Sequence, residues 1–470
     1  MKSTLKTLTV AALLSTVTLS LQAQALQAGY FSDSYLYRHR MNPALANRDA
    51  YFSIPVLGGF NTNLSTNFGV KDFIYERKGG GLTTFMNREV SSEDFKENLS
   101  DHSNLCFNFD LPILSVGFKT GKGYNTIEVG AHARAGMSIS KDLFYFMKDM
   151  ATDRKYDLGD IGGEGMAWAD VAYGYSREVT PDLRIGAKVK ALFGLAYANA
   201  DFSGSSADFQ SDAWQMNFNG TLAIAGGGAM TTKSGTNEMY GYEDFTPGIN
   251  GFGMAFDLGA VYDFERLVPG LQVSAAVTDL GWLKWDCAKA VAENRQFEFD
   301  GFNNVKMHPN QGTVTNGKSG YTDGTIDEQF DRIGDDLEEM AKLDVTEQSV
   351  KENGAIGATA TVGVEYTLPV YKKISFGVLY TQRFSENFGY TEGRAVCNFA
   401  PNKHFDLALS GCASTYGTSW GAIANMHFPG FNLFAGFDRI YTGSVNSDCI
   451  PLESGAVNAS FGISFPLSCK

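Results

Sequence analysis

The sequence lacks any long uninterrupted run of apolar residues beyond its first 25 positions. A membrane-spanning helix needs roughly 18 such residues in succession, so no helix of this kind is predicted. Positive charge is also scarce, because 38 Lys and Arg stand against 52 Asp and Glu in 470 residues, for a formal net charge of −14. Binding to nucleic acid requires a basic surface that releases counterions from phosphate. We therefore expect no nucleic-acid partner.

Patterns typical of metal binding and catalysis are few. The six cysteines include no CxxC pair and the six histidines include no HExxH motif, which leaves a metal or cofactor site unsupported. The motif GTSWG at 417–421 matches the nucleophile elbow of serine hydrolases, but that elbow joins a strand to a helix, and both flanks of this motif resemble strands. The sequence therefore predicts a turn or strand serine and a protein that is not an enzyme.

Glycine and aromatic residues are abundant instead. The chain has 52 Gly, aromatic residues make up 13% and charged residues only 19%, whereas about 25% of residues are charged in a typical protein. This composition is too apolar for a disordered chain and too rich in Gly for a helical bundle. It is typical of many strands joined by tight turns.

The N-terminus, residues 1–25, has the three parts of a secretory signal peptide. Two lysines precede a weakly apolar stretch, and Ala23-Gln24-Ala25 forms a cleavage site. The mature chain is predicted to begin near Leu26, and it is then periplasmic, secreted or a membrane β-barrel. Disulfides are permitted in an exported protein, and Cys397 with Cys412 is the first pair to test because neighbouring strands are expected there.

Alternation of apolar and polar residues with period two is the strongest pattern in the chain. The alternating segments are Phe60–Val70, Asn125–Ile139, Leu183–Tyr197, Phe252–Tyr262, Ile374–Phe384 and Val457–Phe465. The two longest would reach about 50 Å at ~3.3 Å per residue, enough to cross a bilayer at a tilt. Their polar sides carry Gly, Ser, Thr and Asn with few charges, which suits a barrel interior better than a soluble surface.

We therefore predict an all-β fold, a transmembrane antiparallel β-barrel of about 14 strands within a range of 12 to 16, closed because an open sheet edge is not tolerated in hydrocarbon. A soluble secreted β-protein remains the alternative. Residues 91–100, opening with Ser92 as N-cap, and Lys141–Met150 are predicted as short helices. Gly226–Gly251 is predicted as a Gly-rich loop.

The longest insertion, at about 286–353, is predicted to be irregular and extracellular. It contains an acidic helical stretch, Thr325–Leu343. Apolar residues recur there at spacings of three and four, so one face of this helix is expected to dock on something.

Several ionisable residues should face the barrel interior if their apolar neighbours face lipid. They are Glu128, His132, Arg134, Asp170, Arg184, Lys188 and Lys190. On one interpretation they pair with one another in a filled interior. On the other they form a basic lining that guides a carboxylate-bearing amphiphile.

Three motifs carry a family resemblance. Tyr37–Ala44 reads YRHRMNPA and includes Asn42, Pro43 and Ala44, while 257–262 reads DLGAVY and 277–285 reads VTDLGWLKW. Together they resemble FadL-like and PorV-like outer-membrane barrels, and within that group an uncharacterised Bacteroidota family with a domain of unknown function. The resemblance implies about 14 strands, with an N-terminal segment at 26–50 inside the lumen and the barrel at 51–470. The end of the chain departs from the usual terminal aromatic residue, because five residues follow Phe465.

Two functions follow from the resemblance and the pattern. FadL-like members pass hydrophobic molecules, so the first hypothesis is a barrel in the outer membrane of a Gram-negative cell that binds or passes a small hydrophobic or amphipathic molecule, with membrane lipid around it. PorV-like members bind cargo signals in type IX secretion. The alternative is therefore a closed-barrel scaffold or secretion subunit that binds another envelope protein through its loops.

Overall fold

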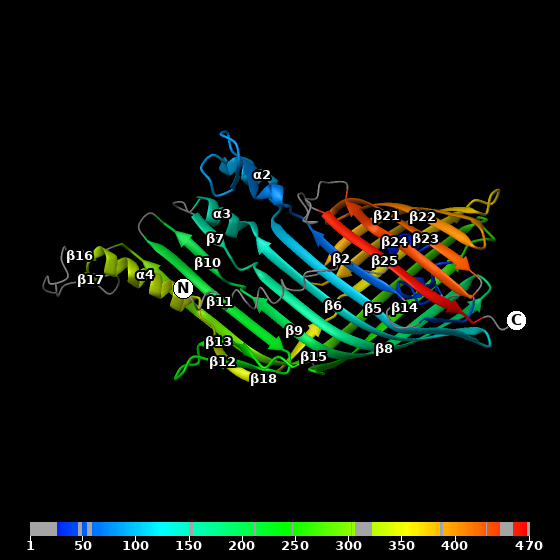
Figure 1. Ribbon diagram of the computed structural model, residues 1–470, viewed down its shortest axis with the longest axis horizontal. Coiled ribbons are helices and arrows are strands. Elements are labelled where there is room, and N and C mark those ends of the chain that lie inside the picture. Colours follow the sequence, from blue (N-terminus) through cyan, green and yellow to red (C-terminus); the bar gives the residue numbers. More distant parts are fainter. Residues whose placement is uncertain are drawn as a thin grey trace.

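A closed antiparallel barrel of 14 strands dominates the computed structural model (Figure 1). The structure describes residues 26–45, 49–53, 59–149, 154–210, 213–246, 248–301, 303–305, 322–385, 389–428, 430–441 and 455–467. The predicted signal peptide lies outside these residues. The last strand closes the wall by pairing with the first along its length. The predicted fold class and strand number are thereby confirmed.

The barrel strands follow one another around the wall in sequence order. They are β2 (Phe60–Thr66), β5 (His102–Thr120), β6 (Gly123–Ser140), β8 (Gly162–Thr180), β9 (Leu183–Asp201), β14 (Gly251–Asp263), β15 (Leu271–Phe299), β19 (Ala358–Thr367), β20 (Ile374–Phe384), β21 (Tyr390–Asn402), β22 (Phe405–Ser414), β23 (Gly417–Phe428), β24 (Phe431–Tyr441) and β25 (Gly455–Pro466). The short strand β1 (Tyr51–Ser53) fills the wall between β25 and β5 at one end. Each predicted alternating segment falls on one of these strands, except that β2 stops at Thr66.

The apolar side of the alternation faces outward, as predicted. Ile127, Val189 and Phe461 are 40%, 38% and 47% exposed on the outer wall. We call the apolar outer surface of the barrel the apolar belt. Its exposed members include Ile127, Val171, Tyr173, Val189, Phe252, Phe256, Val277, Leu280, Trp282, Val362, Val378 and Phe461. Apolar residues that point away from a barrel interior need an apolar environment outside.

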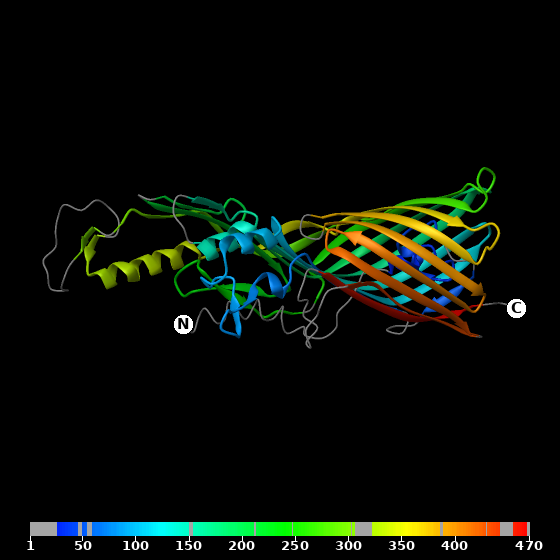
Figure 2. The same cartoon turned by 90° about the horizontal axis from the view of Figure 1, so that it is seen from above.

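Long strands continue beyond the belt at one end of the barrel, on the left of Figures 1 and 2. There β15 lies between β11 (Trp214–Ala225) and β18 (Asp344–Ala355). The sheet continues through β10 (Ser206–Phe209) to β7 (Arg154–Asp157). The prediction of an irregular insertion at 286–353 is therefore wrong at both of its ends, because residues 286–299 and 344–353 are strands whose backbone groups pair with neighbouring strands.

Smaller elements decorate this extension. The hairpin of β12 (Ala229–Thr232) and β13 (Met239–Glu243) occupies much of the predicted Gly-rich loop. Farther out, β16 (Asn303–Val305) pairs with β17 (Thr322–Gly324). They are followed by α4 (Ile326–Met340), whose N-cap Thr325 forms a capping box with Glu328.

The apolar face of α4 is covered by the chain itself. Ile333, Leu337 and Met340 pack with Phe297 of β15 and with apolar side chains of β11. The expectation that this face docks on something is therefore met within the chain.

Two further helices cap the same end of the barrel. They are α2 (Ser92–Asn98) and α3 (Lys141–Asp149), next to the hairpin of β3 (Ile74–Glu76) and β4 (Leu82–Thr84). The N-cap of α2 is Ser91 rather than the predicted Ser92, because the Ser91 hydroxyl accepts from the Asp94 amide at 3.0 Å. Within the described ranges, no helix is long and apolar enough to cross a bilayer.

The chain's first described residues lie inside the barrel, drawn in dark blue in Figures 1 and 2. We call residues 26–45 the luminal segment. It contains two short 3₁₀ helices, η1 (Gln27–Gly29) and η2 (Leu36–Arg40). Its apolar side chains form a buried cluster with Leu379, Val396 and Ile423 of the wall. Residues 46–48 of the predicted 26–50 segment lie outside the described residues.

Candidate functional site

Glycines in the wall make room for the luminal segment. A Cβ atom added at Gly186 would lie 2.3 Å from the carbonyl carbon of Pro43, and one at Gly377 would lie 2.4 Å from the Phe31 ring. Contacts this short exclude any larger residue at either glycine unless the luminal segment moves. The glycines on the polar side of the predicted strands therefore act as a docking surface.

The Asn-Pro-Ala motif forms the tightest part of this contact. The Asn42 side chain is fully buried. Its amide nitrogen donates to the Tyr30 hydroxyl at 3.1 Å, and its oxygen accepts from the Ala44 backbone amide at 2.9 Å. The motif therefore fixes the turn by which the chain leaves the luminal segment.

A buried carboxylate holds the other end of the luminal segment. Asp438 of β24 accepts from the backbone amides of Gln27 at 2.5 Å and Ala28 at 2.7 Å. Arg394 lies 3.5 Å from the same carboxylate and 2.7 Å from Glu392. Because buried charges require partners, this network ties the segment to the wall electrostatically.

The inward-facing residues of strand β9 show that the lumen is filled in successive layers. Gly186 contacts the luminal segment, Lys188 and Lys190 project into a charged layer, and Leu192 lies in an apolar layer above it. That upper layer also contains Trp285, which stacks on Tyr197 with ring centroids 5.1 Å apart. A charged layer is thus enclosed between two apolar clusters.

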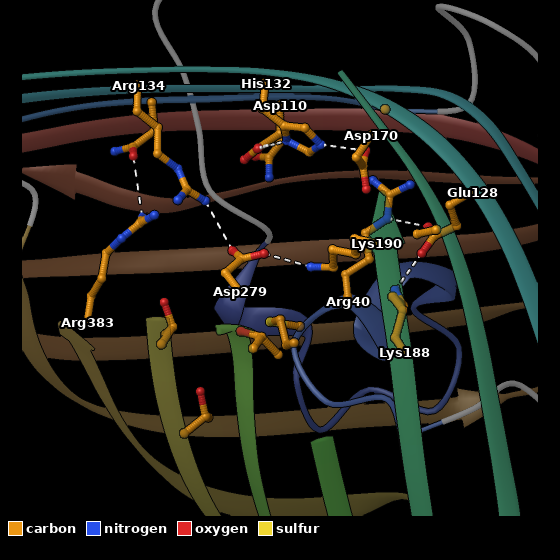
Figure 3. Close-up of a pocket in the computed structure, with 18 of the residues that line it drawn as sticks. Arg40, Asp110, Glu128, His132, Arg134, Asp170, Lys188, Lys190, Asp279 and Arg383 are labelled. Atoms are coloured by element: carbon orange, nitrogen blue, oxygen red, sulfur yellow. Dashed lines mark hydrogen bonds and ion pairs between the residues drawn. The ribbon is translucent and has the colours of Figure 1, made fainter. Parts of the chain in front are cut away.

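A cavity of about 130 Å³ lies in the charged layer (Figure 3). The luminal segment contributes one part of its lining through Gln27, Tyr30, Arg40 and Met41. The wall contributes the remainder: Asn61, Asn108, Asp110, Glu128, Gly130, His132, Arg134, Trp168, Asp170, Ala172, Lys188, Lys190, Leu192, Thr278, Asp279, Thr359, Thr361, Leu379, Thr381 and Arg383.

Glu128 joins the luminal segment to the wall at this cavity. Its carboxylate accepts from Arg40 at 2.6 Å and from Lys188 at 2.5 Å, and His39 lies 3.3 Å away. The Glu128 side chain is only 6% exposed. The buried Glu128 carboxylate thus provides the negative partner that both cations require.

His132 bridges two carboxylates on the neighbouring wall. Its ring nitrogens lie 2.5 Å from Asp110 and 2.9 Å from Asp170, and its ring stacks on Trp168 with centroids 5.1 Å apart. The Arg134 guanidinium also lies over the Trp168 ring, 4.8 Å from its centroid. Trp168 thus stands in the cavity lining, 2% exposed, with His132 and Arg134 packed on its ring.

Asp279 enters the cavity through a β-bulge. Thr278 and Asp279 of β15 together face the single residue Asp257 of β14, and Asp279 has a left-handed backbone with φ of 57°. Its carboxylate accepts from Lys190 at 2.6 Å and Arg134 at 3.1 Å. Asp257 lies behind it, 2.9 Å from Lys190 and 2.8 Å from the Asp279 amide.

Arg383 of β20 differs from the other cations of the cavity. Its two terminal nitrogens reach Asn108 and the Ile356 carbonyl, each at 3.4 Å. Its Nε has no hydrogen-bond partner, and no carboxylate of the described residues lies within ion-pair distance. The Arg383 side chain is nevertheless buried, with 3% exposure.

The structure brings six of the seven predicted ionisable residues to this cavity. They are Glu128, His132, Arg134, Asp170, Lys188 and Lys190. Arg184 lies apart from them beside the β8–β9 turn, pairs with Glu178 at 3.2 Å and is about a third exposed. The six are paired with carboxylates or cations, so they do not form a purely basic lining.

Sequence reasoning missed several members of the site. Asp257 and Asp279 stand in two of the resemblance motifs, and Arg383 lies on the polar side of a predicted strand. Those signals were present. Arg40 meets Glu128 only where the luminal segment docks on the wall, and Trp168 meets His132 through the pairing of β6 with β8. The period-two pattern of a single strand predicts neither contact.

The GTSWG motif and the cysteines take ordinary places in the wall. Ser419 lies within strand β23, and its hydroxyl oxygen is 2.9 Å from the Cys412 sulfur. The suggested disulfide is wrong, because Cys397 faces Leu409 and Cys412 faces Arg394 in the β21–β22 register, and both thiols are free. Over the described part of the chain, no group of three or more His, Cys, Asp and Glu is arranged to hold a metal ion.

Comparison with known proteins identifies one sequence family and several solved structures of low sequence identity. The model of the "Family of unknown function (DUF5723)" matches residues 43–438. No curated protein matches the chain in sequence. The toluene transporter TbuX of Ralstonia pickettii shares 10% identity over 92% of this chain and 94% of its own, with a TM-score of 0.42.

Two further solved structures are similar to the same degree. The Pseudomonas putida toluene transporter TodX shares 8% identity over 95% of this chain and 98% of its own, with a TM-score of 0.41. A Pseudomonas aeruginosa FadL homologue shares 10% identity over 96% of this chain and 100% of its own, with a TM-score of 0.42. None of these likenesses identifies a ligand for this chain.

Proposed function

The chain belongs to the DUF5723 family of unknown function, and we propose that it is an outer-membrane barrel of a Gram-negative cell. Its role is to bind a small amphipathic molecule in the luminal cavity and pass it across the membrane. The observation that carries this proposal is the cavity itself, which offers charged groups and an apolar surface to one ligand. Cavities of this mixed kind are typical of small-molecule sites.

The apolar belt supports insertion into a membrane. Along β15 the outward side chains change from Val277, Leu280 and Trp282 to Lys284 and Asp286. Trp282 thus lies where an interfacial aromatic girdle belongs. A membrane strand spans the hydrocarbon in about 9–11 residues, so the rest of this long strand projects into water.

The dimensions of the cavity limit the ligand. An engineered protein cavity of about 150 Å³ holds benzene, so 130 Å³ accommodates a group of that size. Longer molecules require the luminal segment to move. A purely hydrophobic ligand is disfavoured, because it would leave the surrounding buried charges without polar contacts.

Entry into liposomes tests this function. The purified barrel is inserted into lipid vesicles, and entry of labelled small aromatic and aliphatic amphiphiles is compared with entry into empty vesicles. We expect faster entry with the barrel, and faster still for Asp438→Asn, because the weakened acceptor loosens the luminal segment. Arg184→Gln, outside the cavity, is the matched control and should behave like the parent. Equal entry into loaded and empty vesicles would contradict the proposal.

The alternative is a closed scaffold that binds another envelope protein. The apolar face of the acidic helix α4 suggested this function, but that face packs against β11 and β15 of the same chain. Among the large apolar side chains of α4 whose exposure the structure describes, Phe330 is the strongly exposed one, at 57%. A single exposed side chain is ordinary for a protein surface and does not by itself favour this second function.

A further inference from the structure

The cavity holds one buried cation, Arg383, that has no carboxylate of the described residues within ion-pair distance. Each of the other Arg and Lys side chains that line it lies within ion-pair distance of a carboxylate: Arg40 and Lys188 with Glu128, and Arg134 and Lys190 with Asp279. With the residues that the structure describes, Arg383 makes two hydrogen bonds, both at 3.4 Å, and its Nε makes none. A buried charge without a close partner of opposite charge is unfavourable, so such a group favours binding of an anion.

The surroundings of Arg383 are built for an anion rather than for another cation. Arg134 donates to the same Ile356 carbonyl that Arg383 reaches, so two guanidinium groups converge there. Thr359 lies opposite Arg383 in the β19–β20 register, and Thr359, Thr361 and Thr381 line the cavity with hydroxyl groups. An arginine fork matches the geometry of a carboxylate, and hydroxyl groups can donate to the same oxygens.

The present partners of Arg383 are easily exchanged. Both hydrogen bonds have a donor-to-acceptor distance of 3.4 Å. This is longer than the roughly 2.7–3.2 Å of ordinary N–H···O hydrogen bonds, so each one is weak. A carboxylate would accept two parallel bonds of about 2.8 Å from the same group. There is room beside these groups, because the Asp279 and Asp110 side chains that line the cavity keep 23% of their surface accessible.

We infer that Arg383 binds the carboxylate of the ligand, with Arg134 and Thr359 beside it. This inference rests on the proposed function and names its ligand class, a small carboxylate-bearing amphiphile. The apolar part of the ligand lies against Trp168 and Leu379, which line the same cavity. A benzene-sized carboxylate such as benzoate therefore matches the charge, the size and the aromatic surface.

Calorimetric titration of the detergent-solubilised barrel tests the inference. Benzoate, benzyl alcohol and benzylamine share one ring and differ in charge. We expect benzoate to bind at least tenfold more tightly than benzyl alcohol, and benzylamine to bind least. Arg383→Gln should weaken benzoate roughly tenfold to hundredfold, as expected for the loss of a charged hydrogen bond, and leave benzyl alcohol unchanged.

Two further variants keep the test sharp. Arg383→Lys retains the charge without the fork, so it should recover part of the benzoate affinity and serves if the glutamine variant does not fold. Arg184→Gln removes an exposed arginine outside the cavity and should bind benzoate like the parent. If benzyl alcohol binds as tightly as benzoate and the Arg383 variants bind both normally, the inference is overturned while the proposed function stands. If none of the three compounds binds, both are overturned.

Discussion

Asp279 is the residue at which backbone geometry and charge meet in the cavity. A non-glycine residue with a left-handed backbone costs roughly 1 kcal/mol, and such conformations persist where the surrounding contacts require them. Here the bulge turns the carboxylate toward Arg134 and Lys190. The left-handed backbone and the partly buried ion pairs therefore occur together at this bulge.

Substitution of Asp279 separates these two contributions. Asp279→Ala removes the carboxylate and keeps the strain, so we expect it to lower the free energy of unfolding by about 3 kcal/mol. Asp279→Gly removes the carboxylate and relieves the strain, so it should lose about 1 kcal/mol less. Urea titration in lipid vesicles measures both. Equal losses for the two variants would show that the left-handed backbone carries no cost.

The luminal segment is the element whose position decides what the barrel can do. It packs against the inner side of the wall and supplies part of the cavity's lining. Its contact with the wall depends on glycines that lack a Cβ, such as Gly186 beside Pro43. A side chain there competes directly with the segment for the same space.

Gly186→Val should displace the luminal segment without opening the barrel wall. We expect faster cleavage of the segment by an added protease in detergent, because the valine would overlap the Pro43 backbone. Gly393→Val is the matched control, since a Cβ at Gly393 of β21 meets nothing within 4 Å. The measurement is the rate at which the N-terminal fragment is released. Equal rates for the two variants would contradict this account of the segment.

The strands could be predicted from sequence because the polarity of each residue indicates whether its side chain faces the inside or the outside of the barrel wall. Ile127 and Glu128 differ in polarity and lie on opposite faces, whatever their distant partners are. The meeting of Arg40 with Glu128 could not be predicted in this way, because it depends on where the luminal segment docks. The part of β15 beyond Asp286 could not be recognised in this way. There the alternation changes from apolar residues against small polar ones to small residues against charged ones.

On the scale of the whole molecule, the barrel divides into a belt and an extension. The outward residues of β15 separate these parts, from Val277 in the belt to Glu293 beyond it. The belt requires lipid or detergent, whereas the extension has a charged, water-facing surface. Strand β15 therefore runs from a surface that suits an apolar environment to one that faces water.

An arginine introduced at one of two positions on β15 should distinguish an apolar environment from water. Val277→Arg places a charge in the apolar belt and should cost about 2–4 kcal/mol of stability in lipid vesicles if the site lies near the bilayer midplane. Glu293→Arg places the same side chain on the exposed extension and should change stability by less than about 0.5 kcal/mol. Urea titration in vesicles checks both. A neutral Val277→Arg would mean that the belt does not face hydrocarbon.

The carboxylate of Asp438 also sets an order of events during assembly. It holds amides that precede it by 411 and 410 positions, among the longest separations the sequence allows. Contacts between such distant positions form late, because the intervening chain must first be organised. The luminal segment would thus reach its final place only after the penultimate strand, β24, has formed, and a barrel interrupted before that point would keep this segment undocked.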